Sequence, residues 1–314
     1  MHYALVFSTS KTADTGLDIS DQHGSAAAWL APLAPLVATF TSTDGVKWLD
    51  HARAAEILFS ADRPVNEAIS NTSDFQRLRA LADTHSIDVN IVVTRGRRKQ
   101  LLIADMDSTI ITSESLDDLA AMAGIGDAVA AITKRSMAGE MDFEQALDAR
   151  VAMLAGKSTS LFTQLVADAV LTDGAETLVR TMRSHGAHCY LVSGGFDFIT
   201  EPIAALCGFN DHHANHMDNA DGKITGTVQK PVLDRSAKAD YLAQYCALLK
   251  IDMTAAATIG DGANDLAMLQ AAGMGVAFHA KPLLREAVAL QLNHTDLRGL
   301  LYLQGYAAAE FDHP

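Results

Sequence analysis

The sequence has few cysteines and few basic residues, and both shortages narrow what the protein can be. Its three cysteines, Cys189, Cys207 and Cys246, are widely spaced and form no CxxC motif, which argues for a reducing compartment. Each is more typical of a small core residue than of a reactive thiol. With 24 Lys and Arg against 38 Asp and Glu, the formal net charge is −14. We therefore expect no nucleic-acid or membrane partner, although a small anionic substrate remains compatible with this charge.

Long hydrophobic runs and several common catalytic motifs are also missing. The longest apolar stretch, Ala26–Phe40, is too short to span a bilayer and contains Pro32 and Pro35. It follows a polar, partly acidic segment, which is not typical of a secretory signal. A Walker A loop, a Gly-x-Ser-x-Gly elbow and a Gly-x-Gly-x-x-Gly fingerprint are absent, so kinase, serine-hydrolase and dinucleotide-binding functions lack support. We expect a cytoplasmic protein.

The length of 314 residues is enough for two domains, and a basic cluster marks the boundary that we predict between them. We interpret this cluster as a solvated linker; it consists of Arg95, Arg97, Arg98 and Lys99. The preceding residues, 1–99 with the linker, predict a small α+β domain. The elements behind that prediction are apolar runs near Ala4–Phe7 and Leu36–Phe40, a helical pattern at Phe75–Ala82 and a strand-like segment Val89–Val93.

After the linker, apolar runs alternate with segments of helical length, which predicts a doubly wound, mostly parallel α/β sheet in a domain over residues 100–314. The runs are typical of strands covered on both faces; they are Leu101–Ala104, His188–Val192, Ala255–Ile259 and Met274–Phe278. The first two lie too far apart for one crossover helix. We therefore expect an inserted helical cap at about 115–170.

Local signals place elements within and after this cap. We predict one helix from Ser115, with Asp118 completing a capping box, and another that begins at an Asp142 cap. The segment Asn210–Lys230 predicts a β-hairpin that turns at Asp221-Gly222. Its histidines could bind a metal, but we interpret them as exposed loop residues; they are His212, His213 and His216.

Three of the predicted strands end in polar residues, and the carboxyl ends of parallel strands meet in one crevice. Asp105-Met106-Asp107-Ser108-Thr109 follows the first strand, Ser193-Gly194-Gly195 the second, and Gly260-Asp261-Gly262-Ala263-Asn264-Asp265 the third. Clustered carboxylates repel unless a hard cation neutralises them, and such oxygen sites with open water positions suit Mg²⁺. Taken singly, each segment could be an ordinary turn or helix cap.

Two further features favour an anion site in this crevice. Gly194 and Gly195 would let backbone N–H groups approach an anion in a turn after the strand, and the Ser193 hydroxyl adds a donor. Lys238 follows the expected N-cap Ser236, so it opposes the helix dipole, and this departure from a local rule hints at function. A solvated lysine is the other interpretation.

In their order and positions, these four elements resemble the four motifs of the haloacid dehalogenase superfamily of phosphatases. From about residue 100 onwards the chain resembles the phosphoserine phosphatases, whereas the first hundred residues are only faintly similar to regulatory, ACT-like domains. The resemblance implies that Asp105 is a nucleophile that forms an aspartyl phosphate, and that Asp107 acts as acid and then base. It also implies a Mg²⁺ site and charge-neutralising groups. The metal ligands would be Asp105, the Asp107 carbonyl, Asp261 and Asp265, and the phosphate would meet Lys238, Ser193 and Gly194.

Substrate choice is expected to lie in the cap. One helix face there is apolar except for Arg150, which needs either a structural salt bridge or a substrate carboxylate; this face comprises Phe143, Leu147, Arg150 and Leu154. Glu114 either interacts favourably with a helix N-terminus or binds a substrate ammonium. Both match the family's motifs, as do Met137, which would pack over the substrate or fill the core, and Asn264, which would contact substrate or phosphate.

A cation, an anion and a phosphate pocket together describe an amino acid phosphate. The resemblance therefore predicts hydrolysis of O-phosphoserine, the last step of serine biosynthesis. A phosphatase or phosphotransferase acting on another small phosphate, or a non-catalytic ligand-binding regulator, are the alternatives. The N-terminal domain is open to three interpretations: binding a feedback amino acid, forming a homodimer, or neither.

Overall fold

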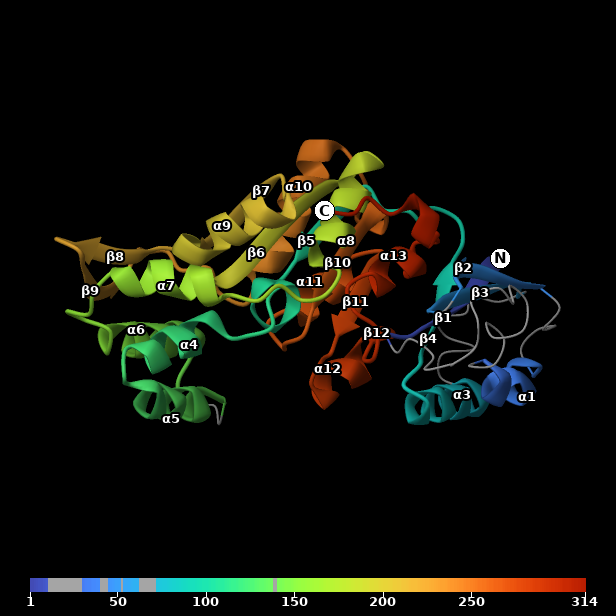
Figure 1. Cartoon of the computed structure of the whole chain (residues 1–314), viewed down its shortest axis with the longest axis horizontal. Coiled ribbons are helices and arrows are strands. Elements are labelled where there is room, and N and C mark those ends of the chain that lie inside the picture. The colour runs from blue at the N-terminus through green and yellow to red at the C-terminus, as the bar shows by residue number, and fades with distance from the viewer. Residues whose placement is uncertain (11–29, 40–44, 52, 62–71, 138–139) are drawn as a thin grey trace.

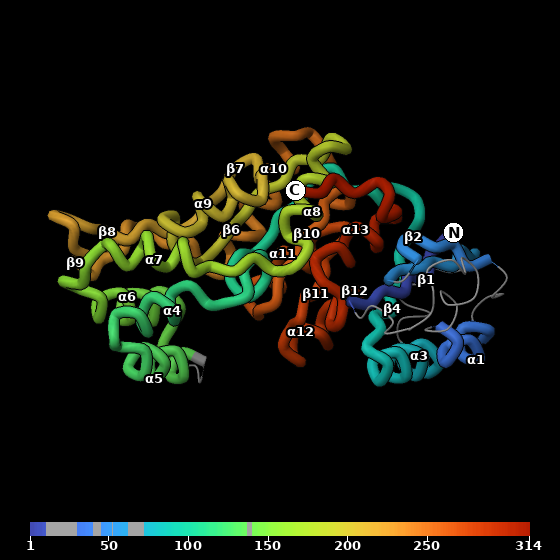
Figure 2. Tube along the Cα trace, in the orientation of Figure 1, coloured from blue at the N-terminus to red at the C-terminus, as the bar shows by residue number. Residues whose placement is uncertain are grey.

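The computed structural model describes residues 1–10, 30–39, 45–51, 53–61, 72–137 and 140–314. Its parts lie in a row (Figures 1 and 2): the N-terminal sheet at one end, a large sheet with its helices in the middle, and a group of helices with a β-hairpin at the other end.

The N-terminal part is a four-stranded antiparallel sheet with helices on one face (Figure 1). Its strands are β1 (His2–Ser8), β2 (Val46–Asp50), β3 (Ala54–Ser60) and β4 (Asp88–Val93), in the order β2-β3-β1-β4. The helices are α1 (Ala34–Val37), after a 3-10 turn at Ala31–Leu33, and α3 (Ser73–Thr84). This order is that of a ferredoxin-like split βαβ arrangement, and it confirms the small α+β fold. Phe40 of the predicted apolar run lies outside the described residues.

The central sheet has six parallel strands in the order β12-β11-β10-β5-β6-β7, which confirms the predicted fold class. They are β5 (Leu101–Ala104), β6 (His188–Phe196), β7 (Asp211–Asn215), β10 (Ala256–Gly260), β11 (Met274–Phe278) and β12 (Leu290–Leu292). Both faces are buried: Leu102 packs in one hydrophobic cluster and Ile103 in another. Full burial on both faces is why these strands are continuous apolar runs in the sequence.

Helices cover the two faces of the central sheet. They are α8 (Ala175–Ser184), α9 (Asp197–Cys207), α10 (Ala237–Leu249), α11 (Leu266–Ala271), α12 (Pro282–Ala287) and α13 (Gly299–Leu303), with 3-10 turns at Met253–Ala255 and Ala308–Glu310. Residues of α8, α9 and α13 share a cluster with Leu102, and residues of α10 and α11 share the other with Ile103. In the described part of the chain, no helix has both the length and the apolar character needed to cross a lipid bilayer.

The cap helices lie between β5 and β6 in the sequence. They are α4 (Ser115–Met122), α5 (Gly126–Met137), α6 (Phe143–Ala152) and α7 (Ser160–Asp168). Asp142 caps α6 through a capping box with Gln145, as its sequence predicts. The capping box predicted for the first cap helix is wrong: Glu114 occupies the N-cap position, and the backbone N–H of Ser115 instead donates to the side chain of Asp107 (2.9 Å).

A β-hairpin packs beside these helices (Figure 1), formed by β8 (Met217–Ala220) and β9 (Lys223–Val228). Its turn is at Asp221-Gly222, as predicted, with both residues at positive φ (50° and 72°). The predicted extent is wrong, because the first residues of Asn210–Lys230 form the parallel strand β7. His212 and His213 therefore lie on a strand of the main sheet instead of in a loop, and Nε2 of His213 lies 2.6 Å from the Tyr245 hydroxyl.

The basic cluster between the two parts is not the solvated linker that its composition predicts. Arg95 and Arg98 are exposed, but Arg97 and Lys99 are buried. Arg97 forms an ion pair with the buried Glu56 of β3 and donates to a backbone carbonyl of α13 (2.9 Å). Lys99 donates to the carbonyl of residue 254 (2.7 Å). These partners come from distant parts of the sequence, so local composition could not indicate them.

Edge strands of the two sheets are also joined directly. The Asn90 side chain on β4 donates to the Gln291 carbonyl on β12 (2.8 Å) and accepts from the Gln291 N–H (2.9 Å). The Asp88 carboxylate accepts from the N–H groups of Asn293 (2.7 Å) and Thr295 (2.8 Å). The N-terminal sheet is thereby held against the loop that follows β12.

Candidate active site

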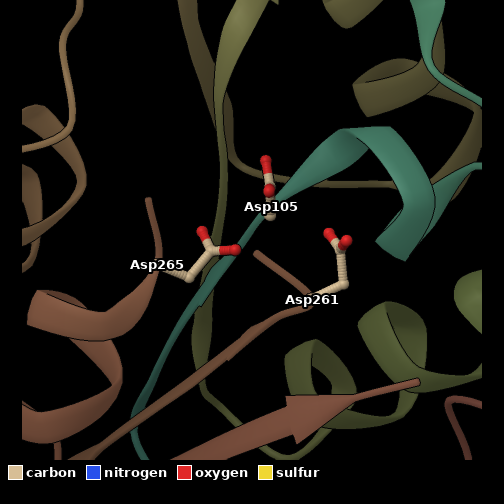
Figure 3. A group of neighbouring side chains, drawn as sticks. All are labelled: Asp105, Asp261 and Asp265. Atoms are coloured by element: carbon tan, nitrogen blue, oxygen red, sulfur yellow. The ribbon is translucent and has the colours of Figure 1, made fainter. Parts of the chain in front are cut away.

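Three aspartates converge at the carboxyl ends of two adjacent strands. Asp105 follows β5, and Asp261 and Asp265 follow β10, which is paired with β5. One carboxylate oxygen from each lies within 4.8 Å of the others, and Figure 3 shows the three side chains around one space. All three are buried. A Cβ at Gly260 would overlap the Asp265 carboxyl group, so glycine is required where these residues meet.

Lys238 supplies positive charge to this cluster. Its Nζ lies 2.6 Å from Oδ1 of Asp105 and 2.6 Å from Oδ1 of Asp265. It is in the first turn of α10, after Ser236 at the N-cap position, but the Ser236 hydroxyl bonds to Asp234 (2.8 Å) instead of capping the helix. Burial alone would lower the pKa of Lys238, but the two carboxylates raise it above its ordinary value. One buried cation thus faces three carboxylates.

The electrostatics of the cluster suit a divalent cation. Burial and the Asp105 charge raise the pKa of Asp261 to about 6. Burial also raises the pKa of Asp265, again with a contribution from Asp105. A nearby divalent cation would stabilise the ionised form of these carboxylates. Mg²⁺ binds oxygen ligands of this kind. The donor set therefore fits a magnesium ion.

Asp107 lies between the sheet and the cap. Its Oδ1 accepts the backbone N–H of Ser115 (2.9 Å), and its Oδ2 lies 3.4 Å from the Ser193 hydroxyl. Burial raises the pKa of Asp107 to about 7, and the charge of Asp105 adds to the effect. Near neutral pH this carboxyl group can both give and take a proton.

Ser193 and Gly194 belong to strand β6, so the turn predicted there is wrong. The strand continues to Phe196 through a register shift between Val192 and Phe196. The irregular backbone brings the N–H of Gly195 to the Ser193 hydroxyl (2.9 Å). A Cβ on Gly195 would lie 3.0 Å from Oδ2 of Asp107, so any other residue there would require the Asp107 carboxylate to shift.

The cap closes over this side of the site. Phe143, the first residue of α6, would lie 3.5 Å from a Cβ on Gly194. A cavity of about 20 Å³ remains between cap and sheet, lined by residues that include Phe143, Ser193, Gly194, Lys238 and Asn264. That volume holds about one water molecule. This cavity is too small for a phosphorylated metabolite.

The predicted specificity residues have different environments. Glu114 is exposed and accepts from the Ser108 hydroxyl (2.8 Å). Arg150 is half-buried on α6, where its Nε donates to the Ala146 carbonyl (3.2 Å). Among the residues that the structure describes, Arg150 forms no ion pair, so the structural salt bridge considered from the sequence is not present. Asn264 is half-buried beside the aspartates, and Met137 ends α5, with a side chain outside the described part.

Sequence reasoning missed a residue of the site. Thr109 is fully buried and donates to Oδ1 of Asp261 (3.3 Å), although its motif suggested no role for it. Its direction depends on the unusual loop backbone, in which Ser108 has a φ of 53°.

Comparison with known proteins agrees with this geometry. A family model described as haloacid dehalogenase-like hydrolase matches residues 102–270. The phosphoserine phosphatase of Streptomyces coelicolor is 41% identical over 228 residues, 72% of this chain and 56% of that protein. The phosphoserine phosphatase of Haemophilus influenzae is 39% identical over 224 residues, 70% of this chain and 71% of that protein. The chain thus spans only about half the length of the Streptomyces relative.

A solved structure extends the similarity to the N-terminal part. The crystal structure of a haloacid dehalogenase family hydrolase from Salmonella enterica serovar Typhi superposes with a TM-score of 0.80. The match covers 96% of this chain and 98% of the Salmonella chain, at 26% identity. With the family model matched over more than half of its length, the chain belongs to the haloacid dehalogenase-like hydrolases.

Proposed function

We propose that this chain is a Mg²⁺-dependent phosphatase that hydrolyses O-phosphoserine to serine and phosphate through an aspartyl phosphate on Asp105. The observation that carries the proposal is the convergence of Asp105, Asp261 and Asp265 within 4.8 Å, with Lys238 in contact with two of them. The names of the related phosphatases support the choice of substrate.

The metal would be held by the carboxylates of Asp105 and Asp261 and by the backbone carbonyl of Asp107, with Asp265 in support. All are hard oxygen donors, and their number leaves positions for water and a phosphate oxygen. When bound, the ion supplies positive charge that stabilises the transferring phosphoryl group. Lys238, already between two carboxylates, adds a second positive charge beside the nucleophile.

The two carboxyl groups of the first motif have different tasks. A carboxylate oxygen of Asp105 attacks phosphorus, forming an Asp105 O–P bond as the bond between phosphorus and the serine oxygen breaks. The Asp107 carboxyl group gives its proton to the departing serine oxygen. Asp107 then takes a proton from a water molecule whose oxygen attacks phosphorus, releasing phosphate and the Asp105 carboxylate. A pKa of about 7 suits Asp107 to both transfers.

Recognition of the amino acid part would come from the cap. Arg150 has no protein ion-pair partner among the described residues and would bind the substrate carboxylate. Glu114 would bind the ammonium, and Ser193, Gly194 and Asn264 would contact the phosphate. Met137 would pack over the substrate. The regulator alternative is disfavoured because a binding protein gains nothing from the repulsion between Asp105 and Asp107.

The test is the variant Asp105→Asn, assayed with Mg²⁺ and O-phosphoserine. We expect loss of turnover with the circular dichroism spectrum and Tm of a folded protein, because the amide keeps the side-chain shape and loses the nucleophile. Substantial residual turnover would refute Asp105 as the nucleophile. The substrate is tested separately: faster turnover of phosphothreonine or a sugar phosphate by the unmodified protein would refute phosphoserine.

A further inference from the structure

A cavity of about 730 Å³ lies between the N-terminal sheet and the central part of the chain. Its walls come from β1, β2 and β3, from the segment before β5, and from the residues that follow α13 (Figure 1). Small-molecule sites are commonly cavities of roughly 300–1,000 Å³, and they occur preferentially where domains meet. The size and the place of this cavity are those of a ligand site.

This cavity is separate from the candidate active site. Arg98 in its wall comes three residues before the start of β5, whereas Asp105 directly follows the end of that strand. A strand of four residues spans roughly 13 Å, so the two sites lie at opposite ends of β5. In the described structure, none of the lining residues belongs to the aspartate cluster. A ligand bound here would therefore leave the aspartates accessible.

Positive charge dominates the lining of this cavity. Its charged residues are Lys47, Arg97, Arg98 and Glu56, so three cations face one carboxylate. Glu310 pairs with Arg98 (2.7 Å) from outside the lining, and counting it still leaves one net positive charge. The chain as a whole has a formal charge of −14, so the cavity is opposite in sign to the rest of the molecule. A local surplus of cations favours an anionic ligand.

One buried carboxylate is shared by two of these cations. Glu56 pairs with Arg97 and, at 3.0 Å, with the Nζ of Lys47. Arg97 is buried and also donates to the Tyr302 carbonyl (2.9 Å), so it forms part of the wall. The Lys47 side chain is 60% exposed and flexible, so its ammonium can leave Glu56 to Arg97 and bind a ligand.

Arg98 is the second cation that can reach a ligand. Its guanidinium lies over the Tyr306 ring, 4.0 Å from the centroid, and one Nη binds Glu310. These contacts fix the plane of the group, as paired hydrogen bonds to an anion require. Its other two nitrogen atoms donate to no described residue. Burial lowers the pKa of Arg97, and the charge of Arg98 adds to this effect while Glu56 opposes it, so the two arginines repel each other.

We propose that this cavity binds a small organic dianion, with either two carboxylates or one carboxylate and one phosphate, through Lys47 and Arg98. Lys47 belongs to the N-terminal sheet and Arg98 to the segment before β5, so two anionic groups on one molecule can contact both. The bound dianion would thereby connect the N-terminal sheet with the central part. This site goes beyond the proposed phosphatase activity and does not depend on it.

The experiment is isothermal titration calorimetry on the full chain after metal removal on a chelating resin. A resin leaves no soluble chelator, which would itself be a competing polycarboxylate. The probes are succinate, with two carboxylates, phosphoglycolate, with one carboxylate and one phosphate, and acetate, with one charge. The ionic strength is held constant, because salt screens charge interactions. Without a metal, the carboxylates of the candidate active site repel anions, so that site does not compete for the probes.

We expect saturable binding of at least one of the two dianions, and binding of acetate at least tenfold more weakly. The dianion that binds more tightly shows whether the second anionic group is a carboxylate or a phosphate. Lys47→Gln and Arg98→Gln should each raise the Kd about tenfold, the effect of losing one hydrogen bond between charged groups. Arg77→Gln is the matched control: Arg77 is exposed on α3, outside the cavity lining, and its loss should leave the Kd unchanged.

Three results would overturn the proposal. They are no saturable binding of either dianion, an unchanged Kd in both Lys47→Gln and Arg98→Gln, and an equal rise in Kd for Arg77→Gln. Scanning calorimetry of each variant shows whether it folds, and the two cavity variants test the site independently of each other. In the same scans, the dianion should raise the Tm of the unmodified chain more than that of Lys47→Gln. Because these measurements involve no turnover, a failure of the proposed phosphatase activity is recognised separately.

Discussion

The carboxylate cluster predicts that the metal-free protein loses stability as the pH rises from about 4 to about 7, and that Mg²⁺ restores it. Three carboxyl groups of the site have strongly raised pKa values in the folded chain, Asp107 and Asp265 at about 7 and Asp261 at about 6, against an ordinary value of 3.8. The perturbation is removal of divalent ions by a chelator at a series of pH values.

The sign follows from the direction of these pKa values. A carboxyl group with a higher pKa in the folded state binds its proton more tightly there than in the unfolded chain. Its contribution to stability is complete below the unfolded pKa near 4 and is lost as the pH passes the folded pKa of about 6 to 7. For Asp107 alone the raised pKa corresponds to at most about 4 kcal/mol of unfolding free energy.

The magnitude is large enough for thermal unfolding to detect. A loss of that size lowers the Tm by roughly 5–10 °C in a chain of this length. Metal ligands must be deprotonated to bind, so Mg²⁺ should raise the Tm more at pH 8 than at pH 5. Scanning calorimetry with chelator and with Mg²⁺, at pH 5, 6, 7 and 8, measures both effects.

Two variants show whether the cluster causes the effect. Asp107→Asn has no proton to lose at this position, so its metal-free Tm should depend less on pH; the part that remains comes from Asp261 and Asp265. Asp118→Asn, outside the cluster, should keep the full dependence. A metal-free Tm that is constant or rises between pH 5 and pH 8 would refute the reasoning, as would equal stabilisation by Mg²⁺ at both pH values.

Two further predictions concern the buried cations. Lys238→Met should lower kcat about 100-fold or more, because it removes preorganised positive charge beside Asp105, the proposed nucleophile. Steady-state kinetics with saturating Mg²⁺ checks this prediction, and near-normal turnover would contradict it. Arg97→Leu should cost about 3 kcal/mol of unfolding free energy by leaving Glu56 buried with only Lys47 as partner. Urea unfolding measures this loss of free energy. Adding Glu56→Gln to Arg97→Leu should partly reverse the loss. An unchanged urea midpoint for Arg97→Leu would show that the buried ion pair contributes nothing to stability.

Patterns that depend on burial of whole segments could be predicted from the sequence. Strands β5 and β11 lie at their predicted positions because each is covered on both faces and so consists entirely of apolar residues. The site followed from that prediction, since Asp105 and Asp261 come directly after adjacent parallel strands. Strands β7 and β12 were not predicted. Strand β7 is short and contains two histidines, and strand β12 has only three residues. Neither strand therefore has a clear hydrophobic pattern in the sequence.

Features that depend on a distant partner could not be predicted. The sequence around Arg97 is typical of a linker, but in the folded chain the N-terminal sheet places Glu56 in contact with it. Ser115 has the spacing of a helix cap, but Asp107 competes for its N–H. In each case the local pattern was present, but a tertiary contact gave the residue another role. The neighbouring residues in the sequence do not indicate such a contact.

Asp107 connects the groups held by the central sheet with those held by the cap. The aspartates and Lys238 are held at strand ends and at the start of α10, so the groups proposed to act on the phosphate belong to the central sheet and its helices. Arg150 and Glu114 belong to the cap. Asp107 contacts both, through Ser193 of β6 and the first N–H of α4. Because that N–H stabilises the ionised carboxylate, any substitution that displaces the start of α4 should raise the pKa of Asp107 and change the pH profile of turnover. A substitution confined to α6 should instead change KM alone.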